Sequence, residues 1–515
     1  MDNKTRKNAK NLSRRDFLKA TGGAAALAGV GATGLILGTR EASATELPKK
    51  WDEEADVVII GSGFAGLAAA IEAKNAGSSV AILEKMRVAG GNSIINGGVV
   101  AAAGSPFQAE KGIKDSPELL LKDMLKAGLN LNHLELARMV ANKSNEVVQW
   151  TINYLGVKYK GLVHLGGHSV PRSYSTYNRS GSAIVNQQLA KLKEFGIKVK
   201  TERYLVKILR DKNGRVKGVQ VRDGYRFPNE NSGTLKYVKA KKAVVMATGG
   251  FSNDIAFRTI QDPKLTADVE STNQPGATAE ALLEALNIGA TPVQPSWIQL
   301  GPWTSPDEKG FGIAPHFTAG TVFQYGVMVD PATGKRFVNE LADRKTRADA
   351  IIKTDNPCIG IADAKGAKGR EGLTAKLIKR GIVKQFNTLN DLAIAYKIPF
   401  KPLKETIENY NSYLVNGEDK EFGRYLQKAA KPIGQSPFYA IRIWPKVHHT
   451  MGGLQINTKA QVIGLDHDPI KGLYAAGELA GGIHGAVRLG SCAVVDCLVF
   501  GRIAGKNAAA EKSWS

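Results

Sequence analysis

The sequence predicts an α/β fold, and three observations at residues 56–85 carry the prediction. Val57–Ile60 is an apolar run with the length of a buried strand, and it ends in a glycine-rich turn at 61–66, GSGFAG. An alanine-rich helical pattern follows at once, and a second strand-like run, Ser79–Leu83, ends in Glu84. A strand, a glycine turn, a helix and an acid-terminated strand in this order are typical of a Rossmann-like dinucleotide-binding unit.

The residue types in this unit suit a pyrophosphate and a ribose. Gly61 permits the tight turn, Gly63 lets backbone N–H groups approach the phosphates, and Gly66 allows the helix to pack closely on the strand. The carboxylate of Glu84 can accept hydrogen bonds from both ribose hydroxyls and would repel a 2′-phosphate. The ligand is therefore expected to be FAD or NAD rather than NADP.

The first 44 residues are expected to be a leader rather than part of the fold. A basic opening precedes SRRDFLK at 13–19, an Ala/Gly-rich apolar run at 21–38, and Ala42-Ser43-Ala44. This segment resembles a twin-arginine export signal with an A-x-A cleavage site, which places the mature start near Thr45 and the protein in the periplasm. An N-terminal membrane anchor is the alternative, and the glycine content of the run and the cleavage site argue against it. Twin-arginine export handles folded proteins, often with the cofactor already inserted, so the leader and the dinucleotide fold support each other.

The composition fits one large two-domain enzyme or two ordinary domains, since the chain has 515 residues, 43% of them hydrophobic. Eight basic and three acidic side chains lie in the leader, so about +18 of the formal charge of +23 belongs to the rest. Nucleic-acid binding is not expected, because the protein is exported and has no basic array interleaved with aromatic residues. Steering of small anions or docking of an acidic electron-transfer partner fits better, with a merely solvated basic surface as the alternative. No other run approaches the roughly 20 apolar residues of a membrane span.

The cysteines are Cys358, Cys492 and Cys497. An odd number without a CxxC pair argues against a disulfide framework, and no metal site is expected. The absence of CxxCH means that the chain carries no covalently attached c-type haem, so electrons must come from another protein.

The later segments extend the first unit and then interrupt it. The loop 90–98, GGNSIINGG, can lie against a flat ring, and the strand-like run 242–246 ends in the glycine turn ATGGF at 247–251. From about Pro292 the helical and strand periodicities are lost among interspersed Trp, Pro, Phe and Gly. The strand-like GLYAAGE at 472–478 and a closing helix at 491–509 return to the first pattern. We therefore expect one domain from 45–291 and 433–515, with a second domain inserted at 292–432.

Five segments occur in the order found in the flavoproteins of fumarate reductases and succinate dehydrogenases. They are the first unit, ATGGF, HHTMGG at 448–453, YAAGE at 474–478 and HGAVRLGS at 484–491. The chain resembles most closely the soluble periplasmic fumarate reductases, without their haem domain, over essentially its whole mature length. The resemblance implies a glutathione-reductase-type FAD-binding domain with an inserted α+β capping domain that closes over the flavin. Succinate dehydrogenases attach FAD through a histidine, and 92–98 contains none, so the expected FAD is non-covalent. The cofactor-binding residues expected from these segments are Gly61, Gly63, Ala65, Gly66, Glu84, Lys85, Gly91, Asn92, Ser93, Gly97, Gly98, Ala247, Thr248, Gly249, Gly250, Gly477, Glu478 and Ser491.

The same resemblance assigns three catalytic residues. Arg488 and His449 lie where the family binds a substrate carboxylate, and the family's proton-donating arginine falls on Arg344. A guanidinium suits bidentate carboxylate binding, and negative charge develops on that carboxylate in the transition state. Arg336 and Arg347 compete for the role of acid, but the register of RFVNE selects Arg344. Without the resemblance, a structural ion pair and a hydrogen-bonded core histidine would be the simpler interpretations of these side chains.

Four positions depart from the fumarate enzymes. They place a histidine, a Thr-Glu pair and an arginine where this chain has Gly301, Ala319, Gly320 and Phe323. A hydrogen bond to a charged group contributes about 1.5–3 kcal/mol, so the loss of two anchors weakens a second carboxylate by roughly a hundredfold to ten-thousandfold. Trp303 and Phe323 would also turn apolar surface toward that charge. The missing acid and arginine leave the proton relay unexplained, with Gln324, Tyr325 or water as substitutes.

The sequence thus favours a periplasmic FAD enzyme that reduces the C=C bond of an acrylate-, methacrylate- or arylacrylate-type monocarboxylate. A c-type cytochrome or another electron donor would supply electrons, in anaerobic respiration. Fumarate or urocanate reduction is the alternative, and urocanate ranks lower because no acidic partner for its imidazole is in register. The reverse dehydrogenation is chemically possible. A non-catalytic electron-carrier subunit is the alternative of a different class, but it would not need Arg344, His449 and Arg488 together.

Overall fold

The computed structural model describes residues 47–514, so the predicted leader lies outside the described residues. The predicted β-α-β unit is confirmed as β1 (Glu53–Ile60), α2 (Phe64–Asn75) and β2 (Val80–Leu83). The two strands are parallel, with Val57 opposite Val80 and Ile60 opposite Leu83. The apolar residues of β1 from Val57 to Ile60 are buried, as expected for a strand covered on both faces.

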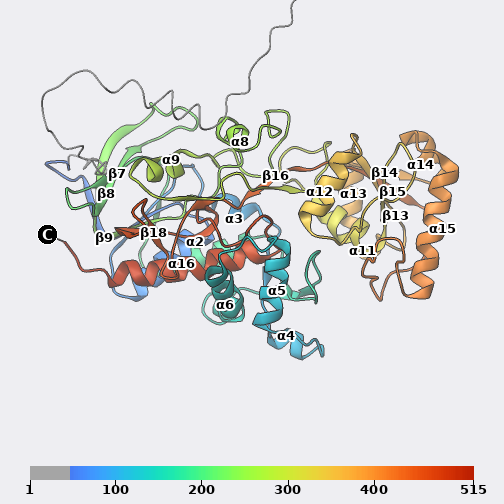
Figure 1. Cartoon of the computed structure of the whole chain (residues 1–515), viewed down its shortest axis with the longest axis horizontal. Coiled ribbons are helices and arrows are strands. Elements are labelled where there is room, and N and C mark those ends of the chain that lie inside the picture. The colour runs from blue at the N-terminus through green and yellow to red at the C-terminus, as the bar shows by residue number, and fades with distance from the viewer. Residues whose placement is uncertain (1–46, 515) are drawn as a thin grey trace, which may run out of the picture. The chain divides into compact units, whose positions relative to one another are not determined.

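The central sheet has the order β18-β19-β9-β1-β2-β6, and β7 and β8 continue from β9. The pairs β1/β2, β1/β9, β9/β19 and β2/β6 are parallel, so the carboxyl ends of these strands share one edge. Helix α16 (Cys492–Ala510) lies alongside α2 (Figure 1). A Cβ on Gly501 would lie 2.5 Å from the backbone oxygen of Ala65, so glycine is required for this close packing. The other strands of this sheet are β6 (Val199–Lys200), β7 (Arg203–Arg210), β8 (Val216–Asp223), β9 (Thr234–Met246), β18 (Gln461–Ile463) and β19 (Pro469–Ala475).

A second, three-stranded sheet and several helices surround this sheet and share its hydrophobic core. The strands of the small sheet are β3 (Val99–Ala101), β4 (Tyr159–Val163) and β5 (Ser173–Thr176). The helices are α3 (Gly91–Ile95), α4 (Pro106–Ala109), α5 (Pro117–Ala127), α6 (Leu134–Asn153), α7 (Ser182–Glu194), α8 (Ile255–Gln261) and α9 (Glu280–Asn287).

The inserted region has its own antiparallel sheet, β12-β13-β15-β14, and two hydrophobic clusters separate from the first core. In Figure 1 its elements run from yellow to orange. The predicted limits at 291/292 and 432/433 stay a prediction, and β15 pairs with strands of the insert although it follows residue 432. The elements are α10 (Ala314–Phe317), the π-helical turn η1 (Thr318–Val322), α11 (Phe323–Tyr325), β12 (Val327–Val329), α12 (Arg344–Lys353), β13 (Cys358–Asp363), α13 (Glu371–Lys379), β14 (Val383–Phe386), α14 (Leu389–Tyr396), α15 (Phe400–Asn416) and β15 (Phe438–Ile443).

Two short strand pairs join the insert to the rest of the fold. β10 (Pro292–Val293) pairs with β17 (Gly453–Leu454), and β11 (Ile298–Gly301) pairs with β16 (Lys446–Thr450). Both pairs lie where the chain enters and leaves the insert. They therefore fix β16, with its two histidines, beside the start of the insert.

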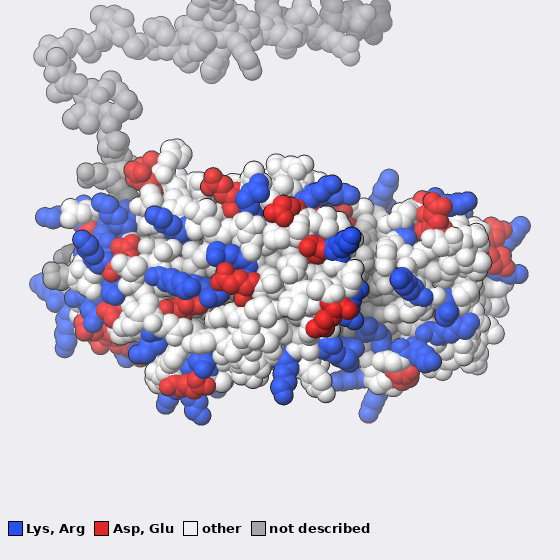
Figure 2. Space-filling model, turned by 90° about the horizontal axis from the view of Figure 1, so that it is seen from below, with Lys and Arg blue, Asp and Glu red and all other residues white. Residues whose placement is uncertain are grey.

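Lys and Arg side chains are scattered over the face shown in Figure 2, with Asp and Glu side chains among them. This distribution agrees with a solvated basic surface as well as with long-range steering of anions. Across residues 47–514, no helix combines the length and the apolar composition that a membrane crossing requires.

Candidate active site

A cavity lies at the glycine turn that follows β1 and extends to Glu84 at the end of β2 and to the turns after β9 and β19. Ligands of open α/β sheets bind at this edge. Thirteen of the eighteen residues predicted to hold the cofactor line it: Gly61, Gly63, Ala65, Glu84, Lys85, Gly91, Asn92, Ser93, Ala247, Thr248, Gly249, Gly477 and Glu478.

The local geometry of this cavity fits a dinucleotide. Gly61 has φ +101°, and a Cβ there would lie 2.3 Å from the backbone oxygen of Ala247, so the turn accepts only glycine. Helix α2 begins after Gly63, which has no side chain to cap it. The N–H of Phe64 donates to Oγ of Ser93 at 2.9 Å, so the N–H groups of Ala65 and Gly66 are the ones left for an anion. The buried carboxylate of Glu84 is held by the backbone N–H and hydroxyl of Ser62, at 3.1 and 2.6 Å, and by the N–H of Met86 at 2.8 Å.

A second cavity continues from the first, and five residues line both: Phe64, Asn92, Ser93, Glu478 and Cys497. Gly97 and Ser491 line only the second cavity. Gly66, Gly98 and Gly250 line neither cavity, and close packing explains why these three positions are glycine. A Cβ on Gly66 would lie 2.1 Å from the oxygen of Gly61, and one on Gly98 or Gly250 would lie 2.2 Å from a threonine hydroxyl.

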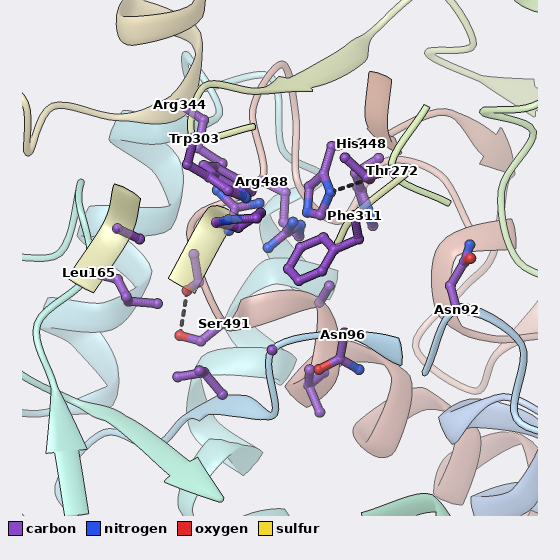
Figure 3. A pocket seen from close by; sticks show the side chains of 18 of the residues that line it. Asn92, Asn96, Leu165, Thr272, Trp303, Phe311, Arg344, His448, Arg488 and Ser491 are labelled. Atoms are coloured by element: carbon purple, nitrogen blue, oxygen red, sulfur yellow. Dashed lines mark hydrogen bonds between the residues drawn. The ribbon is translucent and has the colours of Figure 1, made fainter. Parts of the chain in front are cut away.

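The three predicted catalytic residues meet in the second cavity. Arg344 is the first residue of α12, His449 lies on β16, and Arg488 lies in the loop before α16. Figure 3 shows Arg344 and Arg488 together on one side of the cavity, with Asn96 and Ser491 on the opposite side. Residues from the insert and from both ends of the first domain thus form one site.

The guanidinium of Arg344 is fixed by two neighbours. Its Nη1 donates to Oε1 of Gln299 at 2.9 Å, and its Cζ lies 4.3 Å from the ring centroid of Trp303. Gln299 is itself held, because its Nε2 donates to the backbone oxygen of Arg488 at 2.9 Å. Burial, together with the positive charges of Arg488 and Arg347, lowers the pKa of Arg344 well below its usual value. Such a lowered pKa makes Arg344 a better proton donor than an exposed arginine.

Arg488 is buried and only partly satisfied. Its Nη1 donates to the oxygen of Leu489 at 3.4 Å, and its Nε has no hydrogen-bond partner. Burial lowers its pKa to about 10. Within residues 47–514, neither Arg344 nor Arg488 forms an ion pair with a carboxylate. An unpaired buried cation costs free energy, so this arrangement fits an anionic ligand.

His449 is buried beside Glu478, with its Nδ1 3.4 Å from Oε2 of that carboxylate. Burial lowers the pKa of His449 to about 4, against the opposing effect of Glu478, so the ring is neutral near pH 7. A carboxylate only accepts hydrogen bonds, so the proton belongs on Nδ1 and Nε2 carries the lone pair. A second anion beside the ring would favour the imidazolium form, which can donate from Nε2.

His448 also lines this cavity, and sequence reasoning missed it as a site residue. Successive residues of a strand point to opposite faces, so His448 and His449 would be expected to diverge. The pairing of β11 with β16 passes from Gln299↔His449 to Leu300↔Val447, which leaves His448 as the extra residue of a β-bulge. Its Nδ1 lies 2.7 Å from Oγ1 of Thr272, and burial with the nearby arginines lowers its pKa well below the usual value.

The wall of the cavity around Trp303 is mostly aromatic or uncharged. The ring of Trp303 lies 5.0 Å from that of His448, and Phe323 is buried. A Cβ on Gly301 would meet both Trp303 and His448 at 3.4 Å, so these rings occupy much of the space beside it. The other residues of this wall are Phe311, Pro315, His316, Ala319 and Gln324, and burial lowers the pKa of His316.

Two arginines approach this wall. The guanidinium of Arg370 lies 2.5 Å from the place of a Cβ on Gly320, behind the wall, and does not line the cavity. Arg347 does line it, with its Cζ 4.8 Å from the centroid of Phe323. Of the predicted relay substitutes, Tyr325 does not line the cavity, and Gln324 is occupied by Gln427 at 2.6 Å and by the oxygen of Ala319 at 3.3 Å.

A dinucleotide cavity that opens into a chamber with unpaired buried arginines defines a FAD-dependent oxidoreductase. The FAD binding domain family model matches residues 56–494, and the chain belongs to this family, which includes the fumarate reductase and succinate dehydrogenase flavoproteins. A model of the twin-arginine translocation signal matches residues 11–31, which supports export to the periplasm.

Relatives extend over nearly the whole chain. The chain is 42% identical over 503 residues to an acrylate reductase flavoprotein subunit of Shewanella woodyi, covering 96% of this chain and 98% of the relative. It is 36% identical over 459 residues to a fumarate reductase (cytochrome) of Shewanella frigidimarina, covering 88% and 77%. A solved open conformation of a flavocytochrome c3 fumarate reductase matches with a TM-score of 0.71 and 33% identity, covering 89% of this chain and 79% of that one.

Proposed function

We propose that the protein reduces the C=C bond of an α,β-unsaturated monocarboxylate of the acrylate, methacrylate or arylacrylate type in the periplasm. The observation that carries the proposal is the lining of the second cavity. Arg344 and the buried Arg488 line it without carboxylate partners among residues 47–514. The aromatic rings of Trp303 and Phe323 line the same cavity, and Trp303 packs against Arg344 itself. The 42% identity to an acrylate reductase flavoprotein subunit supports it.

Bound FAD, when reduced, supplies a hydride to one carbon of the double bond. Arg488 and His449 hold the substrate carboxylate, on which negative charge increases as the hydride arrives. The carboxylate raises the pKa of the His449 imidazole, and the protonated ring is then a second charged hydrogen-bond donor to it. Arg344 then gives a proton from its guanidinium to the carbon next to the carboxylate, and Gln299 keeps that guanidinium aimed.

The eighteen residues named above are proposed to hold the flavin without a covalent bond. The stretch 92–98 contains no histidine, and Asn92, Ser93, Asn96 and Gly97 line the second cavity. Cys497 also faces both cavities, but burial raises its pKa well above the usual value, so the thiol is not ionised. Acid precipitation should therefore release the yellow FAD into the supernatant and leave a colourless pellet.

A periplasmic c-type cytochrome, or another electron donor, is proposed to re-reduce the flavin during anaerobic respiration. The chain has no CxxCH motif for a haem of its own, and its excess of basic residues would attract an acidic donor. In this proposal the region 292–432 acts as the capping domain, and it contributes Arg344 to the site.

Fumarate is the second candidate substrate, because one observation favours it. Arg347 lies beside Phe323 and could hold a second carboxylate. Two of its nitrogens already donate to backbone oxygens, so we place fumarate below the monocarboxylates.

The test uses purified FAD-loaded protein with dithionite-reduced viologen as electron donor. The acceptors are acrylate, methacrylate, cinnamate, fumarate and urocanate. The proposal expects kcat/KM for one monocarboxylate to exceed that for fumarate by roughly 100-fold or more. A preference for fumarate contradicts the substrate assignment, and turnover of no acid favours an electron-carrier subunit. Arg344→Lys should abolish turnover with flavin still bound.

A further inference from the structure

Arg347 is a third arginine that lines the second cavity, and it is buried, with 4% of its surface exposed. It follows Arg344 by three residues on α12, so both side chains lie on one face of the helix. No carboxylate lies within ion-pair distance of Arg347 among residues 47–514. It approaches Phe323, which stands where the related fumarate enzymes place a relay arginine.

The contacts of Arg347 hold its guanidinium without neutralising it. Its Nη1 donates to the backbone oxygen of Glu340 at 3.3 Å, and its Nε donates to that of Asp343 at 3.4 Å. Each of the two edges that could hold a bidentate carboxylate, Nε/Nη2 and Nη1/Nη2, thus already has one nitrogen engaged. Arg347 is therefore poorly placed to anchor a substrate carboxylate, although it keeps its full charge.

The free ends of the two α12 arginines reach neighbouring parts of the first domain. Nη2 of Arg347 lies 3.2 Å from the place of a Cβ on Gly166. Nη2 of Arg344 lies 3.7 Å from the place of a Cβ on Gly490, which side-chain atoms of Leu165 approach to 3.2 Å. Since Leu165 and Gly166 are adjacent in sequence and both line the cavity, the two Nη2 groups approach wall residues that adjoin one another.

We propose that Arg347 returns the proton that Arg344 gives to the substrate, an inference that rests on the proposed reduction. Arg344 loses one proton to the substrate carbon, and the N–H bond that breaks leaves a neutral guanidine. One proton then passes from Nη2 of Arg347, through a water molecule at the Gly166–Gly490 wall, to Arg344. Arg347 recovers a proton from solvent when the saturated acid leaves. No electron moves in these steps, and the sum is one proton from solvent for each hydride delivered.

The charge of Arg347 supports this role in a second way. Burial lowers the pKa of Arg347 to about 10, and its charge helps to lower the pKa of Arg344. The charge of Arg347 therefore makes Arg344 a readier donor, and only one of the two needs to be neutral at a time.

The test compares wild type with Arg347→Met, which keeps an unbranched apolar side chain over Phe323, and with Arg347→Lys, which restores a titratable cation. The control is Lys345→Met, which removes a charge from the same helix at an exposed position paired with Asp349. Viologen-linked turnover is measured from pH 6 to 10 with the preferred acid. Binding of propanoate, a saturated product analogue, is followed by the flavin absorbance shift over the same range.

We expect kcat of Arg347→Met to fall by roughly 100-fold or more. KM and propanoate affinity near pH 7 should stay within about threefold of wild type, because Arg488 and His449 still hold the carboxylate and Arg344 keeps its charge. Arg347→Lys should recover part of kcat with a changed alkaline limb, and Lys345→Met should behave as wild type. Removal of one like charge should also let propanoate binding persist to higher pH in Arg347→Met.

The inference alone is overturned by a rise in KM and a loss of propanoate binding with kcat retained, since Arg347 would then be a carboxylate anchor. It is also overturned if kcat and the pH profile of Arg347→Met are unchanged. Equal losses of kcat in Arg347→Met and Arg347→Lys also overturn it, since a purely structural role would not distinguish a returned cation. Failure of wild type to bind propanoate or reduce any acid is the failure of the proposed function, and it removes the inference as well.

Discussion

Gly301→His tests the substrate assignment most directly, because it adds one hydrogen-bond donor beside Trp303 and His448, which line the second cavity. The space allows the first step of the change. A Cβ at Gly301 meets Cβ of His448 and Cζ2 of Trp303 at 3.4 Å, which is ordinary van der Waals contact. The imidazole beyond it extends from a point in contact with both Trp303, whose ring also packs against Arg344, and His448, and both of these rings line the cavity.

One donor to a charged group is worth about 1.5–3 kcal/mol, which corresponds to a gain of roughly 10- to 150-fold in kcat/KM for fumarate. Reduction of acrylate should gain nothing, because acrylate has no second carboxylate. The assay is viologen oxidation with both acids near pH 6.5, where an added imidazole is partly protonated.

Gly301→Ala is the matched control, since it adds the Cβ without the donor. Both variants should retain FAD and should melt close to wild type. If Gly301→His reduces fumarate no better than Gly301→Ala does, the wall does not exclude the second carboxylate by lack of donors. The argument from the missing anchors then fails.

Three further predictions concern the supports of the site. Gln299→Leu removes the hydrogen-bond partner of Arg344, so kcat should fall by roughly 10- to 150-fold with FAD binding unchanged. Single-turnover oxidation of the reduced flavin measures this loss. An unchanged kcat would show that Trp303 alone positions Arg344. Asp419→Ala leaves the buried Arg336 with fewer partners and should destabilise the insert by about 3–5 kcal/mol in urea unfolding, whereas Asp349→Ala, which breaks an exposed pair with Lys345, should have little effect. The FAD-free protein should lose stability as the pH falls from about 6.5 toward 4, by up to about 1.4 kcal/mol per pH unit for His449, because His449 binds a proton in the unfolded chain but not in the folded one. His449→Gln should reduce that slope. An equal slope in both proteins would show that the ring titrates normally.

Local motifs were sufficient to predict the dinucleotide half of the molecule. The strand, glycine turn and helix at 57–75 depend on contacts between residues near in sequence, such as the approach of Gly66 to Gly61. Arg344, His449 and Arg488 were assigned by resemblance, and they do meet in one cavity. Their roles stay a prediction.

The features that sequence reasoning missed depend on register and on side-chain direction. No sequence pattern around His448 predicts a β-bulge. Without the bulge, the ring of His448 would point away from His449. The partner of Gln299 lies 45 residues away on α12, and no periodicity within β11 identifies it. Arg347 was noticed only as a competitor of Arg344, because its burial beside Phe323 depends on how α12 packs against α11.

The charge of the cavity links binding to the order of events in the proposed cycle. Three arginines line the cavity without carboxylate partners among residues 47–514: Arg344, Arg347 and Arg488. Glu478 is shared with His449 and Thr450. The pKa of each of the three arginines is lowered mainly by burial, so each holds its proton less firmly than an exposed arginine. A carboxylate that enters the cavity reverses this, because an opposite charge nearby favours the protonated forms. The bound carboxylate therefore favours the protonated form of Arg344, which is the form that the proposed proton transfer requires. A neutral analogue such as acrylamide lacks that charge and should be reduced far more slowly than acrylate, even where it fits the same space.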